Sequence, residues 1–397
     1  MPTISFDNTE NAFAYKSDKE LKKAKFLFTT MGYPFFVPLG TRITPLLIKG
    51  KMPFINTIVR NTIFKQFVGG ESLEETKAIG DILGKYNVQV ILDYGVEGKE
   101  GENNFDIATD EFIRVINYAA TQKNIPFISV KVTGIARFAL LESLDEAPRL
   151  RSGIHDHEAE IGEWERVKDR MYAICAVAAE KNIGVLIDAE ESWIQDPVDR
   201  LTMEMMAEFN KEKVIVYNTI QLYRHDRLQF LKLSHKIAQQ QNFKLGVKLV
   251  RGAYMEKERA RASQKGYLNP IQPDKVATDK DYDACVIYCL ENIQSISTII
   301  ASHNEKSNLL AFDYMQSNNI PMNHAHIHFS QLYGMSDNIT FNLSKHGCNV
   351  SKYLPFGPIK DVVPYLMRRA QENSSVSGQT GRELALLKRE MNRRKKG

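Results

Sequence analysis

Residues 245–254 read LGVKLVRGAY, a mostly apolar run followed at once by a charged and a small residue. Leu245–Val250 has the length of a strand, and apart from Gly246 and Lys248 its residues are Leu and Val. Such runs are typical of strands that are buried on both faces, as in parallel sheets. We therefore expect a buried parallel strand with polar chemistry at its carboxyl end.

The same kind of run recurs after about residue 85. The other runs are Val88–Tyr94, Phe127–Val132, Val185–Ile187, Val214–Tyr217, Thr298–Ile300, His326–Phe329 and Asn349–Tyr353. Stretches with helical spacing lie between them: Trp164–Glu180, Pro197–Asn210, Arg227–Gln240, Tyr282–Glu291, Lys306–Ser317 and Ile359–Glu372. Eight strand–helix alternations over roughly 300 residues match a (β/α)8 barrel.

A doubly wound sheet is the structural rival of the barrel. The sequence contains neither G-x-G-x-x-G nor G-x-x-x-x-G-K-[ST], so the dinucleotide fingerprint and the P-loop are both missing. We predict an α/β fold of the TIM-type (β/α)8 class. A helical N-terminal segment is expected over residues 1–84, and the barrel with a basic C-terminal tail over residues 85–397.

The charge balance argues against a nucleic-acid binder. The 52 Lys and Arg residues face 48 Asp and Glu residues, for a net charge of +4. Basic residues nevertheless crowd the segment from Lys388 to Lys396. We favour a frayed, solvated tail there, and attraction to an anionic membrane surface is the alternative.

The sequence also bears on the compartment of the protein. The four cysteines are irregularly spaced and form no CxxC pair, which favours reduced thiols. The opening MPTISFDNTENAF resembles neither a signal peptide nor a transit peptide, and no stretch approaches the ~18 consecutive apolar residues of a membrane span. We expect a cytoplasmic protein, peripheral at most on the inner face of the membrane, or a mitochondrial one if the chain is a processed eukaryotic form.

Polar side chains stand at nearly every expected strand end, where barrel enzymes place their chemistry. A Lys in the run FISVKVTG is unfavourable to bury without a partner, and Asp188 is such a partner, so a structural ion pair is one interpretation of Lys131. The full set of strand-end residues is Asp93, Glu97, Lys131, Asp188, Glu190, Glu191, Gln221, Lys248, Arg251, Ser302, His303, Asn304, Gln331 and Tyr353.

The expected helix over Ile359–Glu372 has two different faces. On a helical wheel one face is apolar, and the other carries Tyr365, Arg368, Arg369 and Glu372. That polar face is either solvated, with an Arg368–Glu372 pair, or a fork of guanidiniums that binds a carboxylate or phosphate.

Histidines at 324, 326 and 328 alternate along one stretch, a spacing that could suggest a metal. The stretch has no carboxylate at ligand spacing, and the first two histidines are expected in a loop before the strand. We therefore expect no metal site.

Taken together, these motifs resemble the proline dehydrogenase family, and most closely its monofunctional branch, which includes the mitochondrial enzymes. The resemblance covers about three quarters of the chain, in order, and RGAY combined with YLxRRxxEN is its most specific feature. The matching stretches are LDYGVEG (92–98), VKVTGIARF (130–138), VLIDAEESW (185–193), YNTIQLYR (217–224), KLVRGAYMEKERARA (248–262), ASHNEKS (301–307), FSQLYGMSDNITF (329–341) and KYLPFGPIKDVVPYLMRRAQENSS (352–375).

The resemblance implies a distorted (β/α)8 barrel that binds FAD noncovalently and oxidises L-proline to Δ1-pyrroline-5-carboxylate. Electrons would pass to a quinone, and nucleic acid is not a partner. By the same resemblance Asp188 and Lys248 are the catalytic charged residues, and Glu97 is a gating acid. Substrate would contact Lys131, Leu332, Tyr353, Tyr365, Arg368 and Arg369. FAD would contact Ala189, Gln221, Val250, Arg251, Gly252, Ala253, Ser302, His303, Asn304 and Glu372.

Two other functions remain open on the residues alone. A barrel lyase could use Lys131 to form a Schiff base, which would explain a strand-end lysine but not RGAY. An interaction protein could bind membranes through the basic tail. Tyr353 bears on the substrate, because the resemblance implies a smaller residue there in hydroxyproline-specific relatives, so we expect proline.

Overall fold

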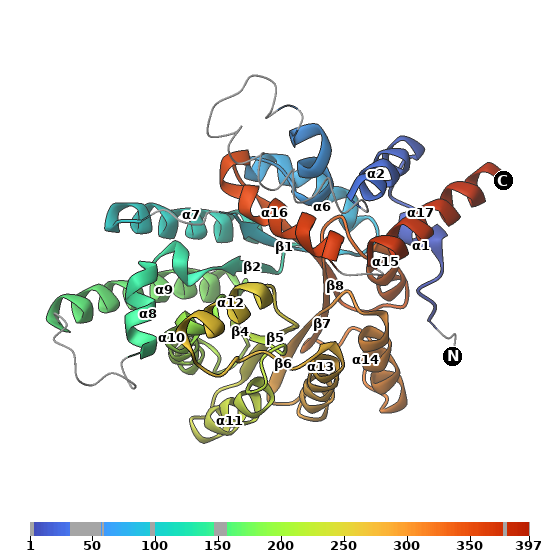
Figure 1. Cartoon of the computed structure of the whole chain (residues 1–397). Coiled ribbons are helices and arrows are strands. Elements are labelled where there is room, and N and C mark those ends of the chain that lie inside the picture. The colour runs from blue at the N-terminus through green and yellow to red at the C-terminus, as the bar shows by residue number, and fades with distance from the viewer. Residues whose placement is uncertain are drawn as a thin grey trace. The chain divides into compact units, whose positions relative to one another are not determined.

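The computed structural model describes residues 4–31, 57, 59–95, 100–146, 157–375 and 379–396. Within these residues eight strands close into a barrel in chain order, and the paired strands are parallel (Figure 1). The strands are β1 (Gln89–Tyr94), β2 (Phe127–Val130), β3 (Gly184–Ile187), β4 (Val216–Gln221), β5 (Leu245–Val250), β6 (Ile296–Ala301), β7 (Ile327–Leu332) and β8 (Val350–Phe356). The predicted barrel is confirmed, and the predicted run Leu245–Val250 coincides with β5.

Helices alternate with the strands along the chain. Those between and after the strands are α7 (Glu102–Ala120), α8 (Phe138–Glu146), α9 (His157–Lys181), α10 (Gln195–Phe209), α11 (Arg227–Gln240), α12 (Met255–Lys265), α13 (Lys275–Glu291), α14 (Glu305–Ser317), α15 (Asp337–Lys345), α16 (Ile359–Ser375) and α17 (Gln379–Lys396). Those before β1 are α1 (Thr9–Phe13), α2 (Asp18–Met31), the π-helical turn η1 (Arg60–Phe64), α5 (Lys65–Phe67) and α6 (Leu73–Gly84). Short 3-10 turns follow β2 and β3 at η2 (Val132–Gly134) and η3 (Ser192–Ile194).

Four helix–strand junctions use the same local device. An asparagine with positive φ follows the end of α6, α9, α11 and α14 by one to three residues, and the apolar residue after it donates its N–H to the carbonyl five residues earlier. At the end of α9, for example, the Ile183 N–H donates to the Ala178 carbonyl at 2.9 Å while Asn182 has φ 55°. This is the Schellman arrangement, which satisfies the last helical carbonyls and turns the chain toward the strand. The four residues are Asn87, Asn182, Asn242 and Asn319.

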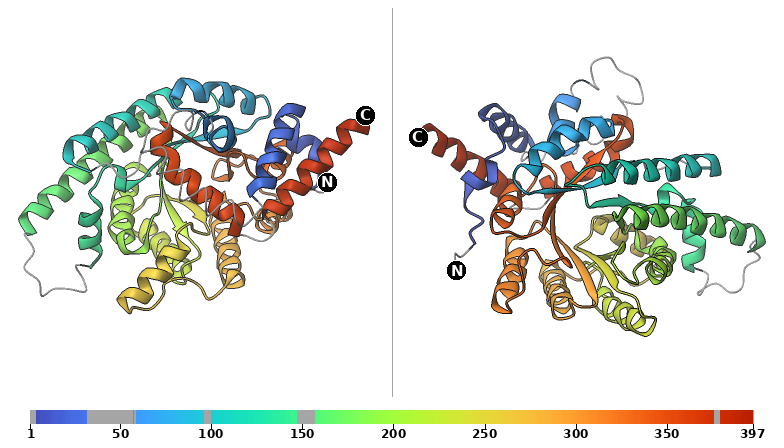
Figure 2. Two further views of the ribbon diagram at one scale, coloured as in Figure 1. Left: turned by 45° about the horizontal axis from the view of Figure 1, so that its top comes forward. Right: turned by 180° about the vertical axis from the view of Figure 1, so that it is seen from behind.

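The chain forms two compact units, one of residues 1–95 and 330–397 and the other of residues 96–329. The core of the first unit is built from both ends of the chain: Phe13, Leu21 and Phe28 of the N-terminal helices pack in one cluster with Val362 and Leu366 of α16. In the second unit α7 and α9 lie side by side, as both views in Figure 2 show. The division at residues 84 and 85 that the sequence suggested stays a prediction.

The basic C-terminal segment forms helix α17, so the prediction of a frayed tail is wrong. Arg394 donates to the Phe13 and Lys16 carbonyls, each at 2.9 Å, and forms an ion pair with Asp18 at 2.8 Å. Arg393 and Arg394 also pair with the fully buried Glu390. The positive charge of this segment is thus partly neutralised by carboxylates from the other end of the chain, and α17 lies beside α2 (Figures 1 and 2).

The four cysteines are buried and form no disulfide. Burial raises the pKa of the Cys289 and Cys348 thiols to about 12, and it raises the pKa of Cys175 and Cys285 as well. These thiols are therefore protonated and unreactive in the folded protein. Among the described residues, no helix has both the length and the hydropathy required to cross a bilayer.

Candidate active site

Three charged side chains meet where β2, β3 and β5 carry the predicted chemistry. Lys131 follows β2, Asp188 follows β3, and Lys248 lies within β5. The Lys248 ammonium contacts one oxygen of Asp188, and the Lys131 Nζ lies 3.6 Å from the other. All three side chains are largely buried. The predicted ion pair between Lys131 and Asp188 is present, and Lys248 joins it as a second lysine. Two ammonium groups thus contact one carboxylate.

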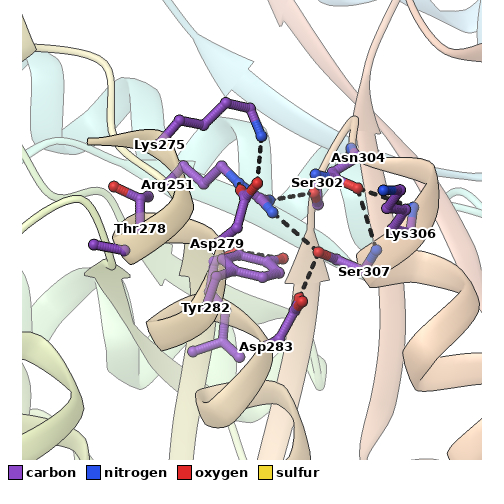
Figure 3. Close-up of polar contacts among 12 residues, drawn as sticks. Arg251, Lys275, Thr278, Asp279, Tyr282, Asp283, Ser302, Asn304, Lys306 and Ser307 are labelled. Carbon is purple, nitrogen blue, oxygen red and sulfur yellow. Dashed lines mark hydrogen bonds and ion pairs between the residues drawn. The ribbon is translucent and has the colours of Figure 1, made fainter.

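Arg251, the residue after β5, is held by four groups (Figure 3). Its guanidinium donates to Asp279 at 2.7 Å and to the hydroxyls of Ser302 and Ser307 at 2.7 and 3.0 Å. Its central carbon also lies 4.2 Å from the centroid of the Tyr282 ring, a cation–π contact. Because the guanidinium contacts groups on α13, on α14 and at the residue that follows β6, its orientation is strongly restricted.

The residues on α13 that hold Arg251 were missed in the sequence. Burial opposes ionisation of Asp279, but hydrogen bonds from Lys275 and Arg251 hold the pKa of its carboxyl below the usual value. Asp283, one turn later, accepts a hydrogen bond from the Ser307 hydroxyl at 2.5 Å. Their signal in the sequence is the i, i+4 spacing of two acids on one face of a helix.

Gly252 is required by the backbone at the end of β5. Its φ is +128°, and a Cβ there would lie 2.5 Å from the Tyr223 ring. Tyr223 is fixed in turn, because its N–H donates to the Arg251 carbonyl at 2.7 Å. The glycine of RGAY is therefore explained by close packing against Tyr223 and by a conformation that other residues rarely adopt.

The segment after β6 caps the N-terminus of α14. The Asn304 side-chain oxygen accepts from the Lys306 and Ser307 N–H groups, at 2.9 and 3.3 Å, and so caps the helix. Ser302 is buried and bonds Arg251, while His303 is half-buried. The structure therefore gives Asn304 a structural role, and its predicted contact with FAD stays a prediction.

In the other unit, α16 carries the predicted guanidinium fork. Its apolar face, including Val362 and Leu366, packs in the core, which fixes the rotation of the helix. Arg369 is buried at 8% exposure and lies over the Tyr365 ring, 5.4 Å from its centroid, whereas Arg368 is half-buried. A simple solvated face is therefore the wrong interpretation for Arg369.

Two further predicted substrate contacts, Leu332 and Tyr353, lie in the same unit and are called the wall residues below. Leu332 ends β7, and Tyr353 is in β8; both are half-buried. The backbone joins the end of β7 to the middle of β8, because the Tyr333 N–H donates to the Tyr353 carbonyl at 2.9 Å. The predicted gate Glu97 lies outside the described residues, as does the side chain of Glu372.

The histidine-rich stretch has structural contacts. His326 bonds the Ile293 carbonyl through Nδ1 at 2.7 Å. His328 is buried edge-on against Phe127, and burial lowers its pKa to about 3. Within the part of the chain that the structure describes, no group of three or more potential ligands could hold a metal.

The residues around Arg251 fit a flavin nucleotide. Arg251 and Ser302 supply donors for anionic groups. Gly252 has no side chain to block the approach of a ligand to its backbone. Thr219 stands opposite Lys248 in the register of β4 and β5, and its buried hydroxyl has no hydrogen-bond partner among the described residues. A buried donor of this kind beside a charged cluster is suited to a polar ligand.

Comparison with known proteins supports this interpretation. A family model described as proline dehydrogenase matches residues 78–382. Mitochondrial proline dehydrogenase 1 of Dictyostelium discoideum is 33% identical over 378 residues, covering 86% of this chain and 66% of the relative. A hydroxyproline dehydrogenase of Xenopus laevis is 31% identical over 413 residues, covering 96% of this chain and 88% of the relative.

Among solved structures, proline utilization A from Bdellovibrio bacteriovorus, inactivated by N-propargylglycine, has a similar fold. The TM-score is 0.72 at 24% identity, with 92% of this chain and 38% of that chain covered. The present chain thus spans about two fifths of that larger protein, and this likeness supports the barrel alone. The match to the family model spans the described candidate residues from Lys131 to Arg369. The chain belongs to the proline dehydrogenase family, whose members oxidise proline with FAD as cofactor.

Proposed function

We propose that this chain oxidises L-proline to Δ1-pyrroline-5-carboxylate through the residues described above. The observation that carries the proposal is that the family match spans residues 78–382, which include both the Lys131–Asp188–Lys248 cluster and the guanidinium fork of α16. The family match favours this reaction over a Schiff-base lyase and over an interaction protein.

Arg368 and Arg369 bind the substrate carboxylate in this proposal. A guanidinium presents several N–H groups in one plane and matches a carboxylate with paired hydrogen bonds, which an ammonium cannot do. Packing of the apolar face of α16 in the core supports a fixed position for both side chains. Fixing the carboxylate on a rigid helix limits the orientations that the pyrrolidine ring can adopt.

Leu332, Tyr353 and Tyr365 border the ring. Apolar and aromatic surfaces exclude water and leave little room beside a bound ring. Tyr353 is the residue that we expect to separate proline from hydroxyproline, because its ring would fill the space that an added hydroxyl needs.

Arg251, Gly252 and Ser302 hold FAD, together with Ala189, Gln221, Val250, Ala253 and His303. When bound, FAD supplies the acceptor for the hydride that leaves C5 of proline. The ammonium groups of Lys131 and Lys248, which both contact Asp188, stabilise negative charge that develops on a neighbouring group. The substrate amine loses its proton before or during this step, and the described residues contain no clear general base for it.

A quinone is the electron acceptor that the family resemblance implies, and contact with a membrane would give access to it. The exposed lysines of α17, Lys388, Lys395 and Lys396, support a peripheral contact with an anionic surface. Such a protein would work at the inner face of the cytoplasmic membrane, or in mitochondria, as two mitochondrial relatives suggest.

An absorption spectrum of the purified protein, before and after anaerobic addition of L-proline, tests the proposal. We expect flavin bands that bleach on addition of proline. A colourless protein that borohydride traps with a carbonyl substrate would instead support the lyase. Flavin bands that persist with proline but bleach with hydroxyproline would identify hydroxyproline as the substrate.

A further inference from the structure

The loop between β7 and α15 carries Leu332 and is held at successive backbone positions. The Tyr333 N–H donates to the Tyr353 carbonyl at 2.9 Å, and the Gly334 carbonyl accepts from the Gln66 side chain at 2.8 Å. All of these residues belong to the unit of residues 1–95 and 330–397. The loop is therefore fixed by contacts to β8 and to the segment before β1.

Lys352 fixes the next position from inside the unit. Its side chain is fully buried, and its ammonium donates to the Met335 carbonyl at 2.5 Å and pairs with Asp337 at 2.9 Å. The second oxygen of Asp337 accepts from the Tyr15 hydroxyl at 2.8 Å and lies 3.6 Å from the Lys16 ammonium. These partners restrict the position of the Lys352 ammonium, because loss of a partner would weaken the stabilisation of a buried charge.

Ser336 is the position at which α17 contacts the loop. Its φ of 51° and ψ of 42° lie in the left-handed region, which is unfavourable for a residue with a side chain. Its N–H donates to a carboxylate oxygen of Glu383 at 2.6 Å. Glu383 is 5% exposed and comes from α17, about 50 residues later in the chain. This hydrogen bond satisfies a buried N–H and so supports the strained conformation.

We propose that Glu383 is a positioning residue, which acts through Ser336 to hold Leu332 and Tyr353 in the geometry that binds proline. The proposal rests on the proposed function, in which these two side chains border the ring. It gives the C-terminal helix a role in substrate affinity although Glu383 itself does not contact the substrate. Because Lys352 precedes Tyr353 and bonds the same loop, a shift at Ser336 is transmitted to both wall residues.

The test compares three substitutions of Glu383 in the full-length, FAD-loaded protein. Glu383→Ala removes the acceptor and should raise the KM for proline about five- to tenfold, with kcat within about twofold and flavin content unchanged. Glu383→Gln keeps an acceptor oxygen and should restore a near-normal KM. Glu383→Asp keeps the carboxyl group but shortens the side chain by one methylene, so it should also raise the KM. This variant replaces Glu383→Ala in the test if the alanine variant does not fold.

Glu390→Gln is the matched control. Glu390 is buried on the same helix but bonds Arg393 and Arg394 rather than the loop, so its substitution should lower the melting temperature without changing the KM. If Glu390→Gln raised the KM as much as Glu383→Ala does, the effect would come from the packing of α17 as a whole, and the proposal would be overturned. A folded Glu383→Ala or Glu383→Asp variant with a normal KM would also overturn it.

Leu332→Ala and Tyr353→Ser separate this proposal from the proposed function. If they change the KM while Glu383→Ala does not, the positioning role is wrong and the wall assignment stands. If neither wall variant changes the KM, the wall assignment itself fails.

Discussion

Arg368 and Arg369 are adjacent in sequence but differ in their surroundings. Arg369 is buried over the Tyr365 ring, while Arg368 is half-buried. A buried guanidinium contributes to packing as well as to binding, so its replacement would mix two effects. Arg368 is therefore the cleaner position at which to test the binding of the carboxylate.

We expect Arg368→Ala to raise the KM for proline by about two orders of magnitude while FAD stays bound. Loss of a charged hydrogen-bonding partner of a carboxylate typically costs about 2–3 kcal/mol, which corresponds to that factor. Steady-state kinetics and the flavin-to-protein absorbance ratio measure the two quantities. Arg114→Ala on α7, which removes an exposed arginine paired with Glu111, is the control and should leave the KM unchanged. A normal KM in the Arg368 variant would remove this residue from the carboxylate site.

Tyr353→Ser should shift the ratio of kcat/KM values from proline toward hydroxyproline. Removal of the ring opens space for the added hydroxyl, and the introduced Ser hydroxyl can bond it. Both substrates are to be assayed with one enzyme preparation, so that flavin content cancels from the ratio. An unaltered ratio would show that specificity is set elsewhere.

The sequence predicted the strands and the residues at their ends, but it missed site residues on helix α13. The run Val214–Tyr217 predicted only the start of β4, which extends from Val216 to Gln221, because an apolar run ends at the first polar residue. Of the polar residues there, Asn218 bonds Asp199 at 2.9 Å, which satisfies its buried amide N–H, and Thr219 stands opposite Lys248. Strand-end charges such as Lys131 and Asp188 were predicted from their position at the ends of apolar runs. Asp279 was missed because its role appears only when α13 packs against Arg251.

Helix α17 was missed for a similar reason. A run of like charges predicts repulsion and fraying when it is considered alone. The partners that stabilise it, Asp7 and Asp18, lie at the opposite end of the sequence. No local pattern could have identified that pairing.

The asparagines that end four helices offer a test at the level of whole elements. Replacing Asn87, Asn182, Asn242 and Asn319 together with Ala should destabilise the protein by about 1 kcal/mol per site, because Ala disfavours the left-handed conformation. The sites are far apart in sequence and in separate junctions, so we expect their effects to add. The corresponding four-glycine variant is the control and should lose little stability. Urea unfolding measures both variants, and equal losses would attribute the effect to the asparagine side chains instead.

At the scale of the whole molecule, Glu383 links pH to stability. Burial, and then the neighbouring Asp337 charge, raise the pKa of its carboxyl to about 7 from the usual 4.5, while Lys352 and Lys16 oppose the rise. The folded protein therefore binds a proton that the unfolded chain has released between these two pH values. The stabilisation is complete below pH 4.5 and is lost as pH rises through 7.

Glu383→Gln should remove this pH dependence. Relative to the parent protein, the variant should gain stability between pH 5 and pH 8, on the order of 3 kcal/mol or about 3 °C in Tm. Thermal unfolding of both proteins across that range gives the difference. Parallel Tm curves would show that Glu383 titrates normally in the folded protein. The pKa of Asp337 is shifted downward despite its burial, because Lys352 and Lys16 stabilise its charge, so its own effect appears only under acidic conditions in both proteins.

The unit made from residues 1–95 and 330–397 has a consequence for synthesis on the ribosome. The apolar face of α2, which includes Leu21 and Phe28, packs in one core with Val362 and Leu366. At roughly 5–20 residues per second, the intervening 235 or so residues take on the order of 10–50 s to emerge. During that interval the N-terminal helices have no partner to bury them. We therefore expect nascent chains that end before residue 330 to engage chaperones and to aggregate more readily than the finished protein.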